Sequence, residues 1–366
     1  MKIDFANLNH QYKLYKQEID AAIHEVLDSS RYIMGPQINE LGIQLAAFTG
    51  SKHCILCSSG TDALLLALMA LDIGPGDDVI TTPFTFIATG EMIAHLGARP
   101  VFVDINETTY NLDPSLIEGA ITDMTKAVMP VSLYGQTADM DEINTLAAKY
   151  NIAVIEDAAQ SFGAEYKGRK SCNLSEFGCT SFFPAKPLGC YGDGGAVFTN
   201  NDEAAAKIKC LRVHGQNQRY RHKYLGIGAR MDTLQAAVLL AKLRHYPDEI
   251  MKRQDVAEQY TRLLKDVVIT PQVRDDRTSV WAQYSIRVKN RDQVQESLKQ
   301  AGIPTAVHYP MPLHVQECFQ YLGLGQGDFP VSEIVSKEIM SLPMNPFLTR
   351  DEQEFVCKSL IEGLRN

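Results

Sequence analysis

The sequence lacks the features that mark several classes of protein. No apolar stretch approaches the ~20 residues that a membrane-spanning helix needs, and the first five residues run straight into polar sequence instead of a leader peptide. An excess of positive charge is also missing: the formal net charge is −9, whereas nucleic-acid or anionic-membrane binding needs clustered positive charge. These absences predict a cytoplasmic protein whose partners include no nucleic acid and no membrane.

Metal-binding and dinucleotide-binding patterns are absent as well. Cys54 and Cys57 form a C-x-x-C, but no second such pair and no histidine pair completes a zinc set. The eight cysteines lie mostly inside apolar runs, as reduced thiols do in cytosolic proteins. No G-x-G-x-x-G follows a strand-like run, and the glycines within 192–195 precede one. We therefore predict no metal site and disfavour a nicotinamide-dependent oxidoreductase.

What the chain does contain is an alternation of strand-like and helix-like segments, which predicts an α/β fold with a mostly parallel sheet covered on both faces. Ligands of such sheets gather at the carboxyl ends of the strands. The strand-like runs are residues 54–57, 79–82, 99–104, 126–132, 152–156 and 180–183.

The pattern changes past Tyr246, where a long polar helix leads to a strand over 281–288, a helix over 291–300 and a short strand into His308. Thr349, with Glu352 three residues later, forms a capping box that opens the last helix. At 366 residues the chain is long enough for two cores. We predict a large domain over 1–245 and a smaller C-terminal α/β domain over 246–366.

Lys186 lies in an irregular segment after the run 180–183. Pro184 and Pro187 prevent a helix from forming there, so the lysine sits on constrained backbone. Burial would disfavour its ammonium form and lower a pKa that starts near ~10.4, leaving an amine able to form a Schiff base with a carbonyl compound. An ordinary lysine of a surface loop is the alternative interpretation.

Three further features fall on the same sheet edge. Asp157 follows the run 152–156 and is either a helix N-cap or the partner of a protonated ring nitrogen. Gly60 and Thr61 open a helix, so their N–H groups are either simply capped or free to bind phosphate. Phe86 can stack on a flat ring. Pyridoxal 5′-phosphate requires an amine, an anion, phosphate donors and an aromatic face, and so explains all four features.

Six stretches resemble the DegT/DnrJ/EryC1/StrS family of nucleotide-sugar aminotransferases, in order along nearly the whole chain. They are residues 59–64, 83–89, 155–161, 181–186, 192–196 and 230–237. The resemblance implies a fold-type I, aspartate-aminotransferase-like fold, a homodimer with shared active sites, and pyridoxal 5′-phosphate as cofactor. It also implies that Lys186 forms the Schiff base, that Asp157 pairs with the pyridine nitrogen, and that Gln160 contacts the cofactor's phenolic oxygen.

The same resemblance implies that Phe86 stacks on the cofactor ring and that Ser181, with the Gly60–Thr61 turn, holds the phosphate. Two positions depart from the family pattern. Many relatives have Asn where this chain has Gly228, and Ser where it has Ala185. Contacts made by those polar side chains are therefore not expected here.

Other stretches resemble the family members that aminate C3 of a UDP-linked 2-acetamido-2-deoxy-3-keto-hexuronic acid with L-glutamate, for bacterial surface polysaccharide (O-antigen) synthesis. They are residues 130–136, 171–175, 186–192, 304–310 and 340–344. In those members an arginine matching Arg230, with the pair matching His308 and Tyr309, engages the sugar acid; a guanidinium can grip a carboxylate with two hydrogen bonds. Tyr32 is a further candidate for contacting the nucleotide sugar. Arg230 in a dimer salt bridge and a satisfied, buried His308 are the alternatives.

The sequence is also compatible with other functions. The first is a 3- or 4-aminotransferase for a dTDP- or UDP-linked keto-deoxysugar without a carboxylate. A sugar dehydratase of the same family is disfavoured, because those enzymes have histidine in place of Lys186. A non-catalytic cofactor-binding or regulatory protein is disfavoured because Lys186 and Asp157 are both present.

Overall fold

The central sheet of the computed structural model has seven strands in the order β1-β9-β8-β5-β4-β2-β3. The model describes residues 3–365, so Met1 and Lys2, which contributed to the argument against a leader peptide, lie outside it. All neighbouring pairs are parallel except the two made by β9, which runs antiparallel to β1 and to β8. The predicted mostly parallel sheet is confirmed. Its strands are β1 (His53–Cys57), β2 (Asp78–Thr81), β3 (Arg99–Phe102), β4 (Thr125–Val128), β5 (Ala153–Asp157), β8 (Phe177–Ser181) and β9 (Gly195–Thr199).

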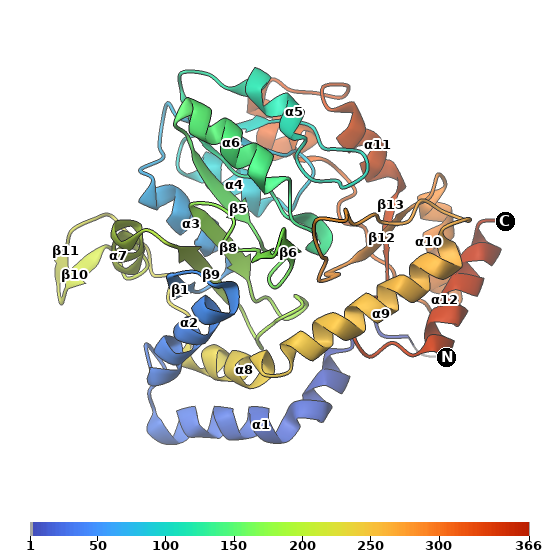
Figure 1. Cartoon of the computed structure of the whole chain (residues 1–366), viewed down its shortest axis with the longest axis horizontal. Helices are drawn as coiled ribbons and strands as arrows, with labels where there is room; N and C mark the ends of the chain where they lie inside the picture. Colours follow the sequence, from blue (N-terminus) through green and yellow to red (C-terminus); the bar gives the residue numbers. More distant parts are fainter. Residues whose placement is uncertain (1–2, 366) are drawn as a thin grey trace.

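Helices cover both faces of this sheet, because successive residues of each strand point to opposite sides. Ile55 and Val79 pack with α3, α4 and α7, whereas Leu56 packs with α2 and α8, and Ile80 with α6. Figure 1 shows the sheet between these layers, with α1 outside α8. The helices are α1 (Leu8–Ser29), α2 (Pro36–Thr49), α3 (Gly60–Ala70), α4 (Ala88–His95), α5 (Pro114–Ile117), α6 (Met140–Tyr150), α7 (Asp202–Leu211) and α8 (Thr233–Leu243).

A second core lies beyond the sheet, reached along the helix α9 (Tyr246–Leu264), which runs across the lower part of Figure 1. The helices around it are α10 (Arg291–Gln300) and α12 (Arg350–Gly363), and its strands β12 (Tyr284–Arg287) and β13 (Ile339–Leu342) pair antiparallel. The helix α11 (Pro330–Glu338) packs elsewhere, since its Val335 lies in a cluster with Phe84 and Tyr134. Ile3 also packs in this core, so the first described residue lies with the C-terminal elements. The domain boundary after residue 245 stays a prediction.

Two local predictions in the C-terminal part have different outcomes. The capping box at Thr349 and Glu352 is confirmed, and it opens α12. The predicted short strand into His308 is wrong, since Ala306 forms only an isolated bridge with Ser341. The segment after Ile303 contains Pro304 and Pro310, and proline cannot donate to a strand ladder.

Two short hairpins also lie outside the central sheet. The pair β6 (Glu165–Tyr166) and β7 (Arg169–Lys170) follows β5, while β10 (Gln216–Gln218) and β11 (Arg221–His222) form the hairpin that projects beside α7 in Figure 1.

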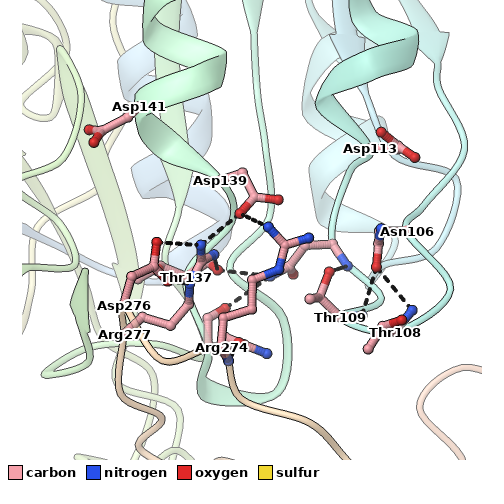
Figure 2. A network of polar contacts seen from close by, with 12 residues as sticks. Asn106, Thr108, Thr109, Asp113, Thr137, Asp139, Asp141, Arg274, Asp276 and Arg277 are labelled. Atoms are coloured by element: carbon pink, nitrogen blue, oxygen red, sulfur yellow. Dashed lines mark hydrogen bonds and ion pairs between the residues drawn. The ribbon is translucent and has the colours of Figure 1, made fainter. Parts of the chain in front are cut away.

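A buried ionic network joins the sheet to the loop before β12. Asp139, which precedes α6, accepts hydrogen bonds from Arg274 at 2.8 Å and from Arg277 at 2.7 Å. Figure 2 shows both guanidinium groups converging on this carboxylate. The Arg277 guanidinium also lies 4.6 Å from the Tyr166 ring centroid and donates to the Thr137 carbonyl. The network thereby fixes the loop that contacts residues 134–137.

Candidate active site

Lys186 lies in a closely packed turn between β8 and β9. The turn is closed by hydrogen bonds from the Phe182 N–H to the Gly194 carbonyl and from the Cys190 N–H to the Phe182 carbonyl, at 2.7 and 2.8 Å. The strand ends at Ser181, so the expectation that it continues to residue 183 is wrong. The regular pairing of β8 with β9 ends at Ser181, opposite Gly195, and the Phe182 N–H bonds to Gly194 in the loop before β9. The lysine is thus placed at the carboxyl edge of the sheet, as predicted.

The Lys186 side chain is half-buried by accessible surface, and the surroundings of its amine are dense. Burial lowers its pKa to about 8, and the nearby Asp157 charge opposes this shift. Among residues 3–365, its Nζ has neither a hydrogen-bond acceptor nor an ion-pair partner. About a tenth of this side chain is therefore a free amine at pH 7, far more than for a solvated lysine, and this form is chemically available to a carbonyl compound.

Asp157 is the last residue of β5 and is buried. The Thr89 hydroxyl donates to Oδ2 at 2.8 Å and the Ala159 N–H to Oδ1 at 3.2 Å. Burial raises the pKa of the carboxyl, while these hydrogen bonds and the charge of Lys186 lower it. A buried carboxylate with this partial compensation is suited to a further cationic partner, such as a protonated ring nitrogen.

Gln160 is held from both ends of its amide. Its Oε1 accepts a 2.7 Å hydrogen bond from the Tyr134 backbone N–H, and its Nε2 donates to the Tyr309 hydroxyl at 3.1 Å. The Tyr134 hydroxyl in turn donates to the His308 carbonyl. Gln160, Tyr309 and His308 therefore form one connected group, although residues 160 and 309 are far apart in the sequence.

The side chain of His308 is a neutral imidazole ring. Burial lowers the pKa of its imidazole to about 4, and the charge of Lys186 acts in the same direction. Nδ1 lies 2.9 Å from the Ser341 hydroxyl, which is 2.9 Å from the Ser285 hydroxyl. His308 near neutral pH is thus an uncharged hydrogen-bonding group and not a cation.

The turn before α3 contacts Ser181. Ser59 caps the helix, because its hydroxyl accepts from the Asp62 N–H at 3.0 Å. The N–H groups of Gly60 and Thr61 belong to the first turn, where a helix leaves them without partners. A Cβ on Gly60 would lie 2.6 Å from the Ser181 Cβ. The approach therefore requires glycine, and it creates a cradle of N–H and hydroxyl donors suited to a phosphate.

Phe86 precedes α4 and has an exposed ring. Its centroid lies 6.2 Å from that of Tyr309, and the hydroxyl of Thr89, three residues later, bonds to Asp157. The start of α4 thus places an aromatic face and a carboxylate partner in the same region.

Arg230 and Tyr32 lie to the side of this group. The Ser58 N–H donates to the Ala229 carbonyl, which puts Arg230 beside the start of the Gly60 turn. The Thr233 N–H donates to the Tyr32 carbonyl. No hydrogen bond or ion pair joins either side chain to Lys186, His308 or Tyr309 within the described chain, so the predicted substrate-binding residues do not form one bonded group in the single chain.

The structure reveals residues of the site that the sequence analysis missed. Thr89 binds Asp157, Tyr134 orients Gln160, and Ser341 bonds to His308. Thr89 lies within the family-like stretch 83–89, which is a signal that was available. Tyr134 acts through its backbone and Ser341 across a sequence gap of 33 residues, and neither relationship leaves a local pattern.

Gly228 is confined by its neighbour His214. A Cβ at Gly228 would lie 3.0 Å from Cε1 of the His214 ring, so an asparagine at this position would require that ring to move. Gly228 forms an isolated antiparallel bridge with Val213, and the His214 N–H donates to the Ile227 carbonyl at 2.9 Å.

The residues present fit pyridoxal 5′-phosphate. The Gly60–Ser181 cradle, the amine of Lys186 without a partner and the incompletely compensated Asp157 match its phosphate, aldehyde and ring nitrogen. Within residues 3–365 no group of three or more His, Cys, Asp or Glu side chains could hold a metal ion. No helix of that region is long and apolar enough to span a membrane.

Comparisons with known proteins agree with this arrangement. The model of the DegT/DnrJ/EryC1/StrS aminotransferase family matches residues 13–361. The UDP-2-acetamido-2-deoxy-3-oxo-D-glucuronate aminotransferase of Pseudomonas aeruginosa is 54% identical, covering 98% of this chain and 99% of its own. The dTDP-3-amino-3,6-dideoxy-alpha-D-galactopyranose transaminase of Aneurinibacillus thermoaerophilus is 41% identical, covering 98% of each chain.

A solved structure gives the same fold with a cofactor in place. The NtdA protein of Bacillus subtilis with bound cofactor PMP has a TM-score of 0.92 and 31% identity, covering 100% of this chain and 86% of its own.

Proposed function

Because the chain belongs to the DegT/DnrJ/EryC1/StrS aminotransferase family, we propose that it transfers the amino group of L-glutamate to C3 of a UDP-linked 2-acetamido-2-deoxy-3-keto-hexuronic acid. The products are 2-oxoglutarate and the 3-amino sugar. We further propose that it acts in the cytoplasm, in the synthesis of bacterial surface polysaccharide (O-antigen). The amino-group transfer follows from the family, whereas the sugar, the donor and the pathway are our proposal.

Pyridoxal 5′-phosphate, the cofactor of this family, carries the amino group between donor and acceptor and delocalises negative charge from the reacting carbon. Lys186 would hold its aldehyde carbon and, when displaced, would move the proton at the carbon that loses or gains the amino group. Asp157 would hold the proton on the ring nitrogen. Gln160 would donate to the phenolic oxygen, which requires its Nε2 to be shared with Tyr309.

The phosphate and the ring would be held by other residues. The N–H groups of Gly60 and Thr61, with the Ser181 hydroxyl, would bind the phosphate, and Phe86 would cover the ring face. One observation carries the proposal: the free amine of Lys186 and the carboxyl of Asp157 influence each other at the sheet edge that also holds the Gly60–Ser181 cradle.

Arg230 and His308 support an acidic sugar. Arg230 has no carboxylate within ion-pair distance among residues 3–365, so its guanidinium is available to a substrate anion. The neutral His308 ring can add a hydrogen bond, as can the Tyr309 hydroxyl. Tyr32, whose side chain is 45% exposed, would contact the nucleotide part.

We also propose that the enzyme is a homodimer with shared active sites. Ile33, Phe86 and Phe183 are 53%, 55% and 51% exposed in the single chain, and burying such side chains against a second copy would be favourable. A second copy would also explain why Arg230 and Tyr32 form no hydrogen bond or ion pair with His308 in the single described chain: each would complete the partner's site.

The test is to present keto sugars to enzyme whose cofactor is in the pyridoxamine form and to follow the return of the pyridoxal absorbance. UDP-linked 3-keto and 4-keto sugars, each with and without the uronic carboxylate, form the set. We expect the 3-keto uronic acid to react fastest. Arg230→Met should remove the preference for the carboxylate, whereas Arg244→Met, an exposed arginine at the end of α8, should keep it.

A second candidate is a 3- or 4-aminotransferase for a dTDP- or UDP-linked keto-deoxysugar. The 41% identical transaminase from Aneurinibacillus thermoaerophilus, which is named for a dTDP-linked deoxysugar, favours it. Equal rates with neutral and acidic sugars in the same assay, unaffected by Arg230→Met, would establish this candidate and contradict the first.

A further inference from the structure

Helix α8 holds the turn that carries Lys186 at two points of its backbone. Lys242 donates a hydrogen bond from Nζ to the Gly189 carbonyl, and Gln235 accepts one from the Tyr191 N–H at 2.8 Å. The two side chains stand seven residues apart on α8, which is two helical turns and therefore the same face. One side chain binds a carbonyl and the other an N–H, so the segment 189–191 is held in both position and orientation.

The position of Gly189 is coupled to that of Lys186, because Gly189 packs against the backbone of the same turn with no free space between them. A Cβ on Gly189 would lie 2.4 Å from the Pro184 carbonyl oxygen and 2.7 Å from that of Phe183. The Phe183 carbonyl also accepts the Lys186 N–H at 2.9 Å. Gly189 is therefore packed directly against the backbone that carries the lysine, and a shift of its carbonyl would displace that backbone.

Within the described chain, Lys242 is a buried lysine without a carboxylate partner, which is unusual for a residue with only a structural role. Its side chain is 3% exposed, and among the described residues no carboxylate lies within ion-pair distance of its Nζ. The ring centroid of Tyr191 lies 5.4 Å from its Nζ. Burial lowers the pKa of this lysine to about 8, with Glu249 opposing the shift. An apolar side chain of similar volume would avoid the cost of desolvating the amine. The contact between Lys242 and the Gly189 carbonyl is therefore made at the expense of folding stability.

We propose that Lys242 is a positioning residue for the reaction, which sets the orientation of Lys186 through the Gly189 carbonyl. This inference rests on the proposed role of Lys186 as the residue that binds the cofactor aldehyde. It assigns no contact between Lys242 and the cofactor or the substrate. Gln235 contributes through its hydrogen bond with the Tyr191 N–H of the same turn.

The experiment compares Lys242→Met with Lys207→Met in full-length protein loaded with pyridoxal 5′-phosphate. Methionine keeps most of the volume and removes the donor and the charge. Lys207, on α7, is the control because its side chain is 17% exposed and pairs with Asp72, which follows α3. Four quantities are measured: the pH midpoint of the cofactor absorbance, kcat, KM, and thermal unfolding of the cofactor-free protein.

For Lys242→Met we expect kcat to fall by roughly 10- to 100-fold, as for a slightly misplaced catalytic group, with little change in KM. The absorbance midpoint should move by more than it does in Lys207→Met, while the melting temperature is unchanged or higher. An unchanged midpoint and kcat with a lower melting temperature would overturn the inference, since Lys242 would then be structural only.

Two further measurements keep the inference falsifiable. If Lys242→Met does not fold, Gln235→Leu takes its place and should show the same shift of midpoint and loss of kcat; wild-type values would again overturn the inference. Borohydride reduction followed by peptide mapping of the wild type tests the premise separately. Cofactor attached elsewhere than Lys186 would contradict the proposed site itself, whereas attachment at Lys186 with wild-type behaviour of both variants would contradict only the role of Lys242.

Discussion

Thr89 and Asp157 are joined by a 2.8 Å hydrogen bond from the threonine hydroxyl to Oδ2 of the carboxylate. Both side chains are buried, and the pair connects the start of α4 to the end of β5. The bond favours the ionised form of a carboxyl that burial alone would drive toward its neutral form. The charge that a protonated cofactor nitrogen needs thus depends on a residue that does not reach the cofactor in our proposal.

Thr89→Val should therefore impair catalysis without disrupting the fold, because valine keeps the branched shape and removes the donor. A hydrogen bond to a charged group contributes about 1.5–3 kcal/mol, so we expect kcat to fall by roughly tenfold or more. Steady-state kinetics with glutamate checks this. Thr85→Val is the matched control, since its hydroxyl bonds to Thr89 and not to Asp157. An equal effect of both substitutions would show that the Asp157 contact is not what matters.

The cofactor-free protein should capture pyridoxal 5′-phosphate with a pH dependence set by Lys186. Burial lowers its pKa from 10.5 to about 8, so the amine is protonated below that pH and free above it. The capture rate should rise about tenfold per pH unit up to about 8 and then level off. Stopped-flow absorbance between pH 6 and 10 measures it. A rate that keeps rising to pH 10 would indicate an ordinary, solvated lysine.

Gly60→Ala should weaken cofactor binding, because its Cβ would lie 2.6 Å from the Cβ of Ser181. Either the helix start or the serine must move, and the phosphate cradle opens. We expect at least a roughly tenfold rise in the dissociation constant of pyridoxal 5′-phosphate, which corresponds to about 1.4 kcal/mol, in fluorescence titration. Gly74→Ala is the control, since a Cβ there meets nothing within 4 Å. Wild-type affinity of Gly60→Ala would refute the assignment of this turn to the phosphate.

Asp139→Ala should destabilise the protein strongly. Arg277, whose side chain is 1% exposed, would keep its ion pair with the partly exposed Asp276 but lose the one with the buried Asp139. We expect a loss of about 3 kcal/mol, the lower end for a broken buried ion pair. Asp141, two residues after Asp139, points away from the network in Figure 2. Its side chain is 40% exposed and pairs with Lys167 and Arg169. Asp141→Ala should cost no more than about 1 kcal/mol. Urea unfolding of both variants decides this, and equal losses would contradict the distinction between the buried and the exposed ion pair.

The parts of the site that the sequence predicted are those whose signal is local. Asp157 ends an apolar strand, Gly60 and Thr61 open a helix after a strand, and Lys186 is flanked by prolines, so each position follows from its own neighbours. The resemblance then supplied the roles that local patterns leave open, such as that of Gln160. The family, the sheet type and the use of pyridoxal 5′-phosphate were all reached in this way.

Other predictions failed or stayed incomplete because their basis is not local. The strand β8 ends at Ser181 because Phe182 bonds to Gly194 across the return of the chain, and no run of apolar residues reveals that. In our proposal, Arg230 and Tyr32 meet His308 only across the interface with a second subunit. No local sequence pattern reveals such a contact.

By itself, the sequence determined which segments form strands and helices and which chemical groups stand at their ends, because backbone preferences and hydrophobic periodicity act over a few residues. The tertiary structure decided which of those ends meet. It inserted β9 antiparallel between β1 and β8, brought Tyr134 to Gln160 and Ser341 to His308, and set Lys242 beneath the turn of Lys186. Such contacts depend on close packing between distant segments, which only the whole chain specifies.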